Sequence, residues 1–246
     1  MALAFWVVKL ATTAGGESIA DLLAMDVRGM RPALALTGGL LLVALVVQIA
    51  APRYRAVAYW AVVVLVGIGG TLITDTLVQI LGLSVLAATG FFLAALLVTL
   101  GVWYRLEGTL SIHSITTRRR ELFYWAAVLE TFALGTAAGD LTAFRWTWGF
   151  PVSMAFFGAL FAVAALAWRL GAPAVACFWA AYVMTRPLGA TTADWLAFDR
   201  SLGALGLGLG PVSLAFGVAI VALVGWLAVT GRDTPTPERA PAPVGG

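Results

Sequence analysis

Residues 5–21 read Phe-Trp-Val-Val-Lys-Leu-Ala-Thr-Thr-Ala-Gly-Gly-Glu-Ser-Ile-Ala-Asp, and the same pattern recurs three more times in the chain. In each copy an aromatic–Trp pair is followed by Gly ten residues after the Trp and by Asp fifteen residues after it. The copies are Phe5-Trp6…Gly16…Asp21, Tyr59-Trp60…Gly70…Asp75, Tyr124-Trp125…Gly135…Asp140 and Phe178-Trp179…Gly189…Asp194. Fixed-period self-similarity indicates one supersecondary unit that has been multiplied. The Trp-to-Trp steps of 54, 65 and 54 residues suggest a duplicated two-unit half with a longer central link.

Composition indicates a membrane protein. Hydrophobic residues make up 61% of the chain and charged residues only 11%, far from the average of soluble proteins. Four segments lack charged residues, and each can hold a bilayer-crossing helix of about 20 residues; they are residues 32–52, 76–104, 146–168 and 201–231. Alternating with the Trp…Gly…Asp segments, they predict eight helices, near residues 5–24, 33–51, 57–82, 84–104, 122–142, 149–168, 174–197 and 211–230.

The predicted fold is all-α. We expect a polytopic membrane helical bundle of eight transmembrane helices, arranged as four tandem parallel two-helix repeats near residues 1–55, 56–119, 120–173 and 174–232. Residues 1–232 would form a single membrane domain, followed by a disordered Pro-rich tail over 233–246. We expect residues 5–24 to be the first span rather than a cleaved signal, because Lys9 and Glu17 interrupt their apolar run.

The arginines predict the topology. Connections from even to odd helices, with the tail, carry nine: Arg53, Arg55, Arg105, Arg118, Arg119, Arg120, Arg169, Arg232 and Arg239. The other connections carry four: Arg28, Arg31, Arg145 and Arg200. Basic residues concentrate on the cytoplasmic side of a membrane, so both termini are predicted to be cytoplasmic. The four odd helices would then run outward, each starting with its Trp as an anchor at the inner interface.

Polar residues follow one face of each odd helix, since residues four apart share a face. Counting back from each Asp in steps of four residues gives one row of four residues on each odd helix, which we call a lane. The lanes are Lys9, Thr13, Glu17, Asp21; Val63, Gly67, Thr71, Asp75; Val128, Phe132, Thr136, Asp140; and Tyr182, Arg186, Ala190, Asp194. A charged group costs about 2.5–3.5 kcal/mol at mid-bilayer, so these groups must turn inward, pair or border water. We predict at least one ion pair among the deep charges, which are Lys9, Glu17, Glu130 and Arg186.

Two interpretations of these groups stay open. The four repeated Asp residues either cap helix ends and bond neighbouring backbone, or line an ion pathway. The four deep charges break the fourfold pattern, which favours a functional role for them, with an asymmetric structural salt bridge as the alternative.

Glycine and proline lie near the predicted midplane of the odd helices, at Gly15-Gly16, Gly69-Gly70, Gly135 and Pro187. Small residues allow close helix packing in lipid. Alternatively, helix breaks free backbone carbonyls that bind a cation. We expect close packing in the second and third odd helices, and a kink or break in the first and fourth, where Pro187 removes a helix hydrogen bond. Thr13, Thr71 and Thr136 would either bond the freed backbone or serve as oxygen ligands near this depth.

These motifs resemble a bacterial family of integral membrane proteins built from four tandem two-span repeats, each with a characteristic Trp and of unknown function. The resemblance covers about residues 1–232, including Phe5–Leu23, Tyr59–Leu77, Thr109–Leu141 and Phe178–Leu196. The family's motif positions correspond to Lys9, Thr12, Thr13, Gly16, Glu17 and Asp21, then Gly70, Thr71 and Asp75, then Gly135, Thr136 and Asp140, then Arg186, Pro187, Gly189 and Asp194. The fourth copy departs from the pattern with Ala193, where Gly is expected before the Asp. The resemblance implies the fold and a bacterial membrane location, and it implies no activity.

The leading functional hypothesis is a multi-pass transporter or permease of the bacterial cytoplasmic membrane for a small inorganic cation, coupled to protons. Its candidate ion pathway comprises Lys9, Thr13, Glu17, Asp21, Asp75, Glu130, Thr136, Asp140, Arg186 and Asp194. Oxygen ligands suit protons and hard cations. The alternatives are a passive channel and a non-transporting scaffold, sensor or accessory subunit.

Other activities are not expected. One Cys177 and one His113 exclude a Cys/His metal site, so any metal stays unassigned. We expect no enzymatic activity, because no nucleophile–base set is visible, and no cofactor. The expected partners are the lipid bilayer and a small ion or solute, with homo-oligomerisation left open and no nucleic acid.

Overall fold

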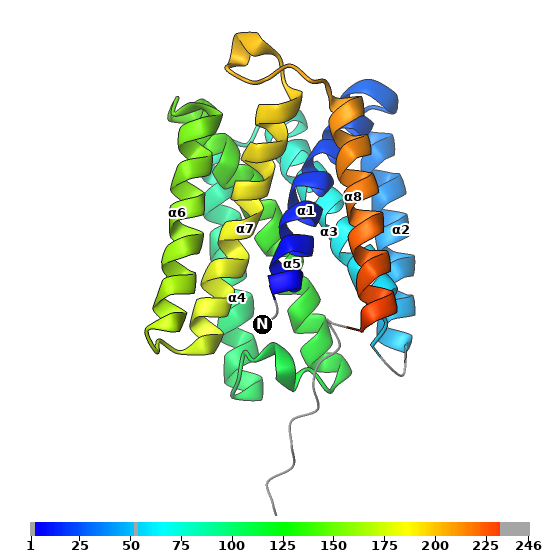
Figure 1. The fold of residues 1–246 in the computed structure, drawn as a ribbon, viewed down its shortest axis with the longest axis vertical. Helices are drawn as coiled ribbons and strands as arrows, with labels where there is room; N and C mark the ends of the chain where they lie inside the picture. The colour runs from blue at the N-terminus through cyan, green and yellow to red at the C-terminus, as the bar shows by residue number, and fades with distance from the viewer. Residues whose placement is uncertain (1–2, 52–53, 232–246) are drawn as a thin grey trace, which may run out of the picture.

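The computed structural model describes residues 3–51 and 54–231 as an all-α bundle whose long helices run side by side (Figure 1). The helices are α1 (Leu3–Asp21), α2 (Met30–Ala50), α3 (Ala56–Asp75), α4 (Val85–Glu107), α5 (Arg118–Asp140), α6 (Gly149–Arg169), α7 (Ala174–Ala197) and α8 (Leu209–Thr230). All eight predicted helices are therefore present near their predicted positions. The predicted Pro-rich tail at 233–246 lies outside the described residues.

Six helical segments within the described ranges are long and apolar enough to cross a membrane: Met30–Ala50, Ala56–Ile80, Val85–Glu107, Arg118–Arg145, Gly149–Arg169 and Leu209–Thr230. The chain is therefore a multi-pass membrane protein. The two remaining helices, α1 and α7, hold Lys9, Glu17 and Arg186, and these charged side chains are buried inside the bundle. Their polar content is the reason that composition alone does not identify them as spans.

The odd-numbered helices form an inner ring. Each of α1, α3 and α5 contacts the next odd helix, and α7 contacts α1. Aromatic residues at their starts contact one another; for example, the hydroxyl oxygens of Tyr59 and Tyr124 lie 2.5 Å apart. The Asp residues at their ends line one cavity. The four inner helices therefore run in the same direction.

The even-numbered helices surround this ring with an offset. Each packs mainly against the inner helix that follows it in the chain, so that α2 lies on α3, α4 on α5 and α6 on α7. The last outer helix, α8, packs on α1 and closes the ring (Figure 1). Outer helices expose apolar side chains such as Val43 on α2 and Val221 on α8. These surfaces suit contact with lipid, whereas the polar groups of the lanes are kept inside.

The motif glycines allow the inner helices to approach closely. A Cβ placed on any of them would strike the neighbouring inner helix: Gly67 for Gly16, Phe132 for Gly70, Arg186 for Gly135 and Thr13 for Gly189. Close packing therefore explains the glycine in all four helices, including α1 and α7. We expected a kink or a break in those two helices, and the break is absent, because α1 continues through Gly16 and α7 continues through Pro187.

The ends of the inner helices differ between copies. In the first three copies a π-helical segment follows the Asp directly, at Leu22–Val27, Thr76–Ile80 and Leu141–Arg145. In the fourth copy α7 stays α-helical to Ala197. The π segments carry side chains that line the cavity mouth, among them Met25, Gln79 and Phe144.

Substitution of Gly70 tests this packing. A Cβ there would lie 2.8 Å from Phe132 Cβ and 3.0 Å from the backbone nitrogen of Ala133. We expect Gly70→Ala to lower the free energy of unfolding by about 1–3 kcal/mol, because overpacking forces the helices apart. Thermal unfolding in detergent measures the effect. Gly101→Ala in α4 is the matched control, since nothing lies within 4 Å of its Cβ position. An equal loss in both variants would contradict the close-approach explanation.

Candidate functional site

The four lanes face one another along the axis of the inner ring. Arg186 of α7 donates from Nη1 to the carbonyl oxygen of Thr13 at 2.6 Å and from Nη2 to that of Gly67 at 3.4 Å. One helical turn closer to the Asp residues, Glu17 of α1 accepts hydrogen bonds from Thr71 of α3 and Thr136 of α5. Residues at the same level of different helices thus form layers, although they lie far apart in the sequence.

A buried ion pair occupies the centre of the ring. Nη2 of Arg186 contacts Oε2 of Glu17, and both side chains are almost fully buried. The hydroxyl of Thr71 donates to the same oxygen at 2.7 Å, and that of Thr136 does so at 3.1 Å. Arg186 also donates to Thr71 Oγ1. The predicted ion pair among the deep charges is confirmed, and its partners are Glu17 and Arg186.

Lys9 lies on the opposite side of Arg186 from the cavity described below and has no carboxylate partner within the described residues. Its Nζ lies 3.8 Å from the ring centroid of Tyr182 and 3.9 Å from that of Phe132, and it makes no described hydrogen bond. Ring faces stabilise a cation electrostatically. The guanidinium carbon of Arg186 lies 5.1 Å from the centroid of the same Phe132 ring. Two aromatic rings thus hold Lys9, and Phe132 also contacts Arg186.

The aromatic partners of Lys9 had no role in the sequence-based prediction. Phe132 and Tyr182 do occupy lane positions on their helices, so the fourfold count already placed them beside the polar groups. An aromatic residue at a lane position, one level from the deep charges, is the signal that could have identified them.

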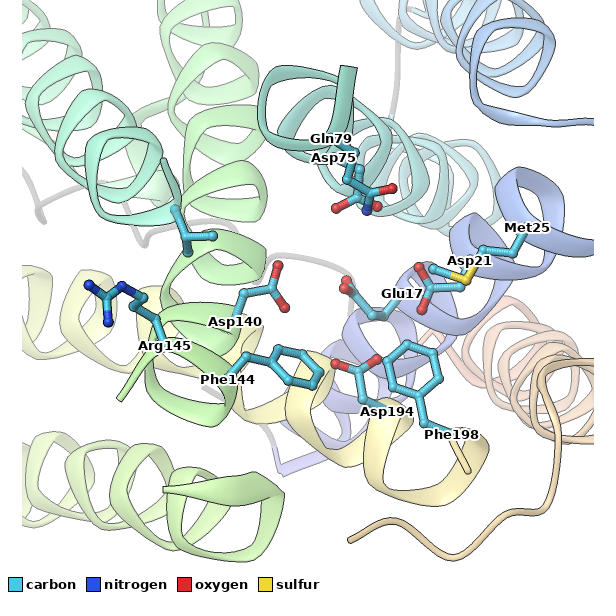
Figure 2. A pocket seen from close by; sticks show the side chains of 11 residues that line it. Glu17, Asp21, Met25, Asp75, Gln79, Asp140, Phe144, Arg145, Asp194 and Phe198 are labelled. Atoms are coloured by element: carbon cyan, nitrogen blue, oxygen red, sulfur yellow. The ribbon is translucent and has the colours of Figure 1, made fainter. Parts of the chain in front are cut away.

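A cavity of about 430 Å³ lies between the ends of the inner helices. Figure 2 shows the carboxylates of Asp21, Asp75, Asp140 and Asp194, one from each repeat, pointing toward one shared space with Glu17. Its lining is Glu17, Asp21, Met25, Asp75, Gln79, Val85, Asp140, Phe144, Arg145, Asp194 and Phe198. Glu17 thus lies between the cavity and the buried Arg186. Arg145, the one basic residue of the lining, points away from the carboxylates (Figure 2).

The four Asp carboxylates have no protein partner in the described parts of the chain. Asp21 and Asp194 are each 4% exposed and Asp75 is 6% exposed, yet no side-chain hydrogen bond or ion pair to any of the four is found there. Asp21, Asp75 and Asp140 are the N-cap residues of the three π-helical segments, and none of their carboxylates makes a capping hydrogen bond. The structural alternative of helix capping therefore does not hold for the Asp set.

Glu130 lies apart from this cluster. It is half-buried on α5, where its Oε1 accepts a hydrogen bond of 2.8 Å from Thr99 of α4. It is not among the residues that line the cavity. The structure therefore brings together nine of the ten predicted pathway residues along the ring axis and leaves Glu130 on an outer face. Glu130 is off the lane by its position in the sequence, which is consistent with this placement.

An aromatic layer closes the other end of the inner ring. The repeat Trp residues belong to it and are buried in the protein, with Trp60 1% exposed and Trp125 and Trp179 each 5% exposed. The expectation that they anchor the chain at the lipid interface is wrong for these three, because neighbouring helices bury their rings; Trp179, for example, contacts Trp103 of α4 and donates to the carbonyl oxygen of Leu110. Phe5 contacts Trp60 and Phe178 across the ring. The cavity is thus open at the Asp end and closed at the Trp end.

Comparison with known proteins identifies the repeats. A family model described as a Repeat of Unknown Function (DUF347) matches residues 4–54, 58–109, 123–171 and 177–233. These four matches agree with the predicted repeat boundaries, and each covers one inner helix and the outer helix that follows it. No similar curated protein and no similar solved structure was found.

Proposed function

This chain belongs to the DUF347 family of repeat proteins, and from that premise we propose that it transports a small inorganic cation across the bacterial cytoplasmic membrane. The observation that carries the proposal is the set of unpartnered Asp carboxylates, one per repeat, around a cavity that ends at Glu17. Carboxylates at membrane depth are costly unless something compensates their charge. No hydrogen bond or ion pair to these four carboxylates is found in the described ranges, which supports a cation from solution as their partner.

The sign of the charge favours a cation over an anion. Five carboxylates line the cavity, and its single basic lining residue is turned away from them. A cleft lined by one sign of charge with low-dielectric walls concentrates ions of the opposite sign. Arg186 is separated from the cavity by Glu17, which neutralises it.

The closed aromatic end favours a transporter over a passive channel. A channel needs a continuous path, whereas here Lys9, Phe132 and the aromatic layer fill the axis beyond Arg186. In the proposed orientation both termini are cytoplasmic, so the cavity opens to the exterior. Transport then requires a second state in which the aromatic end opens and the Asp end closes.

Proton coupling follows from the ion pair. Protonation of Glu17 would remove the charge that holds Arg186, and Arg186 would then repel a cation in the cavity. Binding of a proton and binding of a cation would thereby oppose each other. Lys9, held only by ring faces, would act as a second deep charge that responds to the rearrangement.

Flux measurements in reconstituted vesicles test the proposal. We expect wild-type protein to speed the equilibration of at least one hard cation from a panel of Na⁺, K⁺, Mg²⁺, Ca²⁺ and Mn²⁺, with a matching change in internal pH. Glu17→Gln should abolish that flux. Glu130→Gln is the matched control and should leave it unchanged, because Glu130 lies outside the cavity. Equal rates in wild-type, Glu17→Gln and protein-free vesicles for every ion would refute transport.

A further inference from the structure

We infer that Glu17, Asp21 and Asp194 form a binding site for one divalent cation. One carboxylate oxygen of each residue lies within 4.8 Å of one from each of the other two. Divalent cations bind oxygen at about 2.0–2.6 Å, so two ligands of one ion are at most about 4–5 Å apart. The three oxygens are thus close enough to share an ion without movement of the backbone. The inference deepens the proposed function and rests on it for the passage of the ion across the membrane.

A second observation points to a ligand. Asp21 and Asp194 are each 4% exposed, line the cavity and have no described hydrogen-bond partner. Figure 2 shows both carboxylates aimed into the same space as Glu17. Ionised carboxylates that point at one another repel, and a cation between them would remove that repulsion.

Hydrogen bonds from neighbouring side chains orient Glu17 as a metal ligand. All of its described hydrogen bonds fall on Oε2, which accepts from Thr71, Thr136 and Arg186. Oε1 is left for the cavity, which Glu17 lines. Hydrogen bonds from an outer shell fix the orientation of a metal ligand and are a common feature of metal sites. Thr136 and Arg186 therefore act here as positioning residues.

The charge and the type of ligand indicate which ion fits. Three carboxylates contribute three negative charges and Arg186 contributes one positive charge, which leaves two negative charges for a divalent cation to neutralise. The lining of the cavity contains no Cys or His. Carboxylate ligands without thiolate or imidazole suit Mg²⁺, Ca²⁺ and Mn²⁺. Asp75 and Asp140 line the same cavity and would attract the ion without belonging to the three-residue site.

Equilibrium binding to the purified full-length protein in detergent tests the site, with Mn²⁺ as the probe for electron paramagnetic resonance and calorimetry. We expect one Mn²⁺ per chain, displaced by Mg²⁺ or Ca²⁺. Asp21→Asn and Asp194→Asn should each weaken binding at least about tenfold, and Thr136→Val should weaken it about tenfold through Glu17. Asp199→Asn is the matched control, because Asp199 lies outside the cavity and bonds the backbone of Ser201.

The outcomes separate this site from transport in general. Absence of saturable Mn²⁺ binding by the wild type would overturn the site, as would wild-type affinity in both Asp21→Asn and Asp194→Asn. An equal loss of Mn²⁺ affinity in Asp75→Asn and Asp194→Asn would also overturn it, since all the Asp carboxylates of the cavity would then bind the ion. Monovalent flux in vesicles without divalent binding would leave the proposed function standing, whereas Mn²⁺ binding without any flux would overturn the function alone.

Discussion

Arg186→Ala is expected to lower the free energy of unfolding by about 3–5 kcal/mol, because it leaves Glu17 as an uncompensated buried charge. Arg186 is fully buried and bonds Thr13, Glu17, Thr71 and Thr136 at once. Chemical or thermal unfolding in detergent micelles measures the loss. Arg186→Lys should recover little of it, since an ammonium group cannot reproduce the bonds of a planar guanidinium on several sides.

A double substitution identifies the cause of this instability. In Glu17→Gln/Arg186→Ala the charge left behind by the arginine is removed as well, so we expect part of the stability to return. Arg145→Ala is the control for loss of an arginine at the cavity, and it should change stability by less than about 0.5 kcal/mol because Arg145 is exposed. Simple addition of the two single-substitution effects would show that the pair does not act as a unit.

Cysteine labelling is expected to give an all-or-none pattern that reports the side on which the cavity opens. Cys177 is the only cysteine and is buried, so Cys177→Ala provides the background. In the proposed orientation, Gln79→Cys at the cavity mouth should react with a membrane-impermeant maleimide in intact cells. His113→Cys, in the exposed connection between α4 and α5, should react only after the cells are permeabilised.

A buried position completes that experiment. Val63 is 0% exposed at the first lane level of α3, so Val63→Cys should stay unlabelled in both conditions. Labelling of His113→Cys in intact cells, with Gln79→Cys protected, would place both termini outside and reverse the proposed direction of the cavity. Labelling of both positions in intact cells would contradict the conclusion that the bundle spans the membrane, because Gln79 and His113 lie at opposite ends of the inner helices.

The lanes could be predicted from the sequence because they depend on local geometry. Residues four apart share a helix face whatever surrounds the helix, and a pattern repeated four times implies equivalent positions in equivalent helices. Glu17, Thr136 and Arg186 therefore converge as the spacing indicates. The ion pair between Glu17 and Arg186 was predictable because pairing lowers the cost of a charge at that depth.

Features that depend on distant neighbours could not be predicted. Trp60 and Trp179 look like lipid-interface anchors along their own helices, but the helices beside them in the ring bury both rings. The sequence places Glu130 off the polar lane of its helix, but it does not show that Thr99 of α4 is its partner. Continuity of α7 through Pro187 could not be predicted either, since a proline inside a helix removes a backbone hydrogen bond.

The offset between the two layers of helices has a consequence for any shorter version of this chain. The cover of α1 is α8, the last helix, and no helix of the first half packs on α1 from that outer position. A protein with only the first two repeats would have no outer helix packed on α1, and only two of the four inner helices would surround its axis. Two such molecules could complete each other, with the α4 of one copy covering the α1 of the other. Four repeats in one polypeptide thus resemble a two-fold dimer joined into a single molecule by the connection between α4 and α5, with deep charges that differ between the halves.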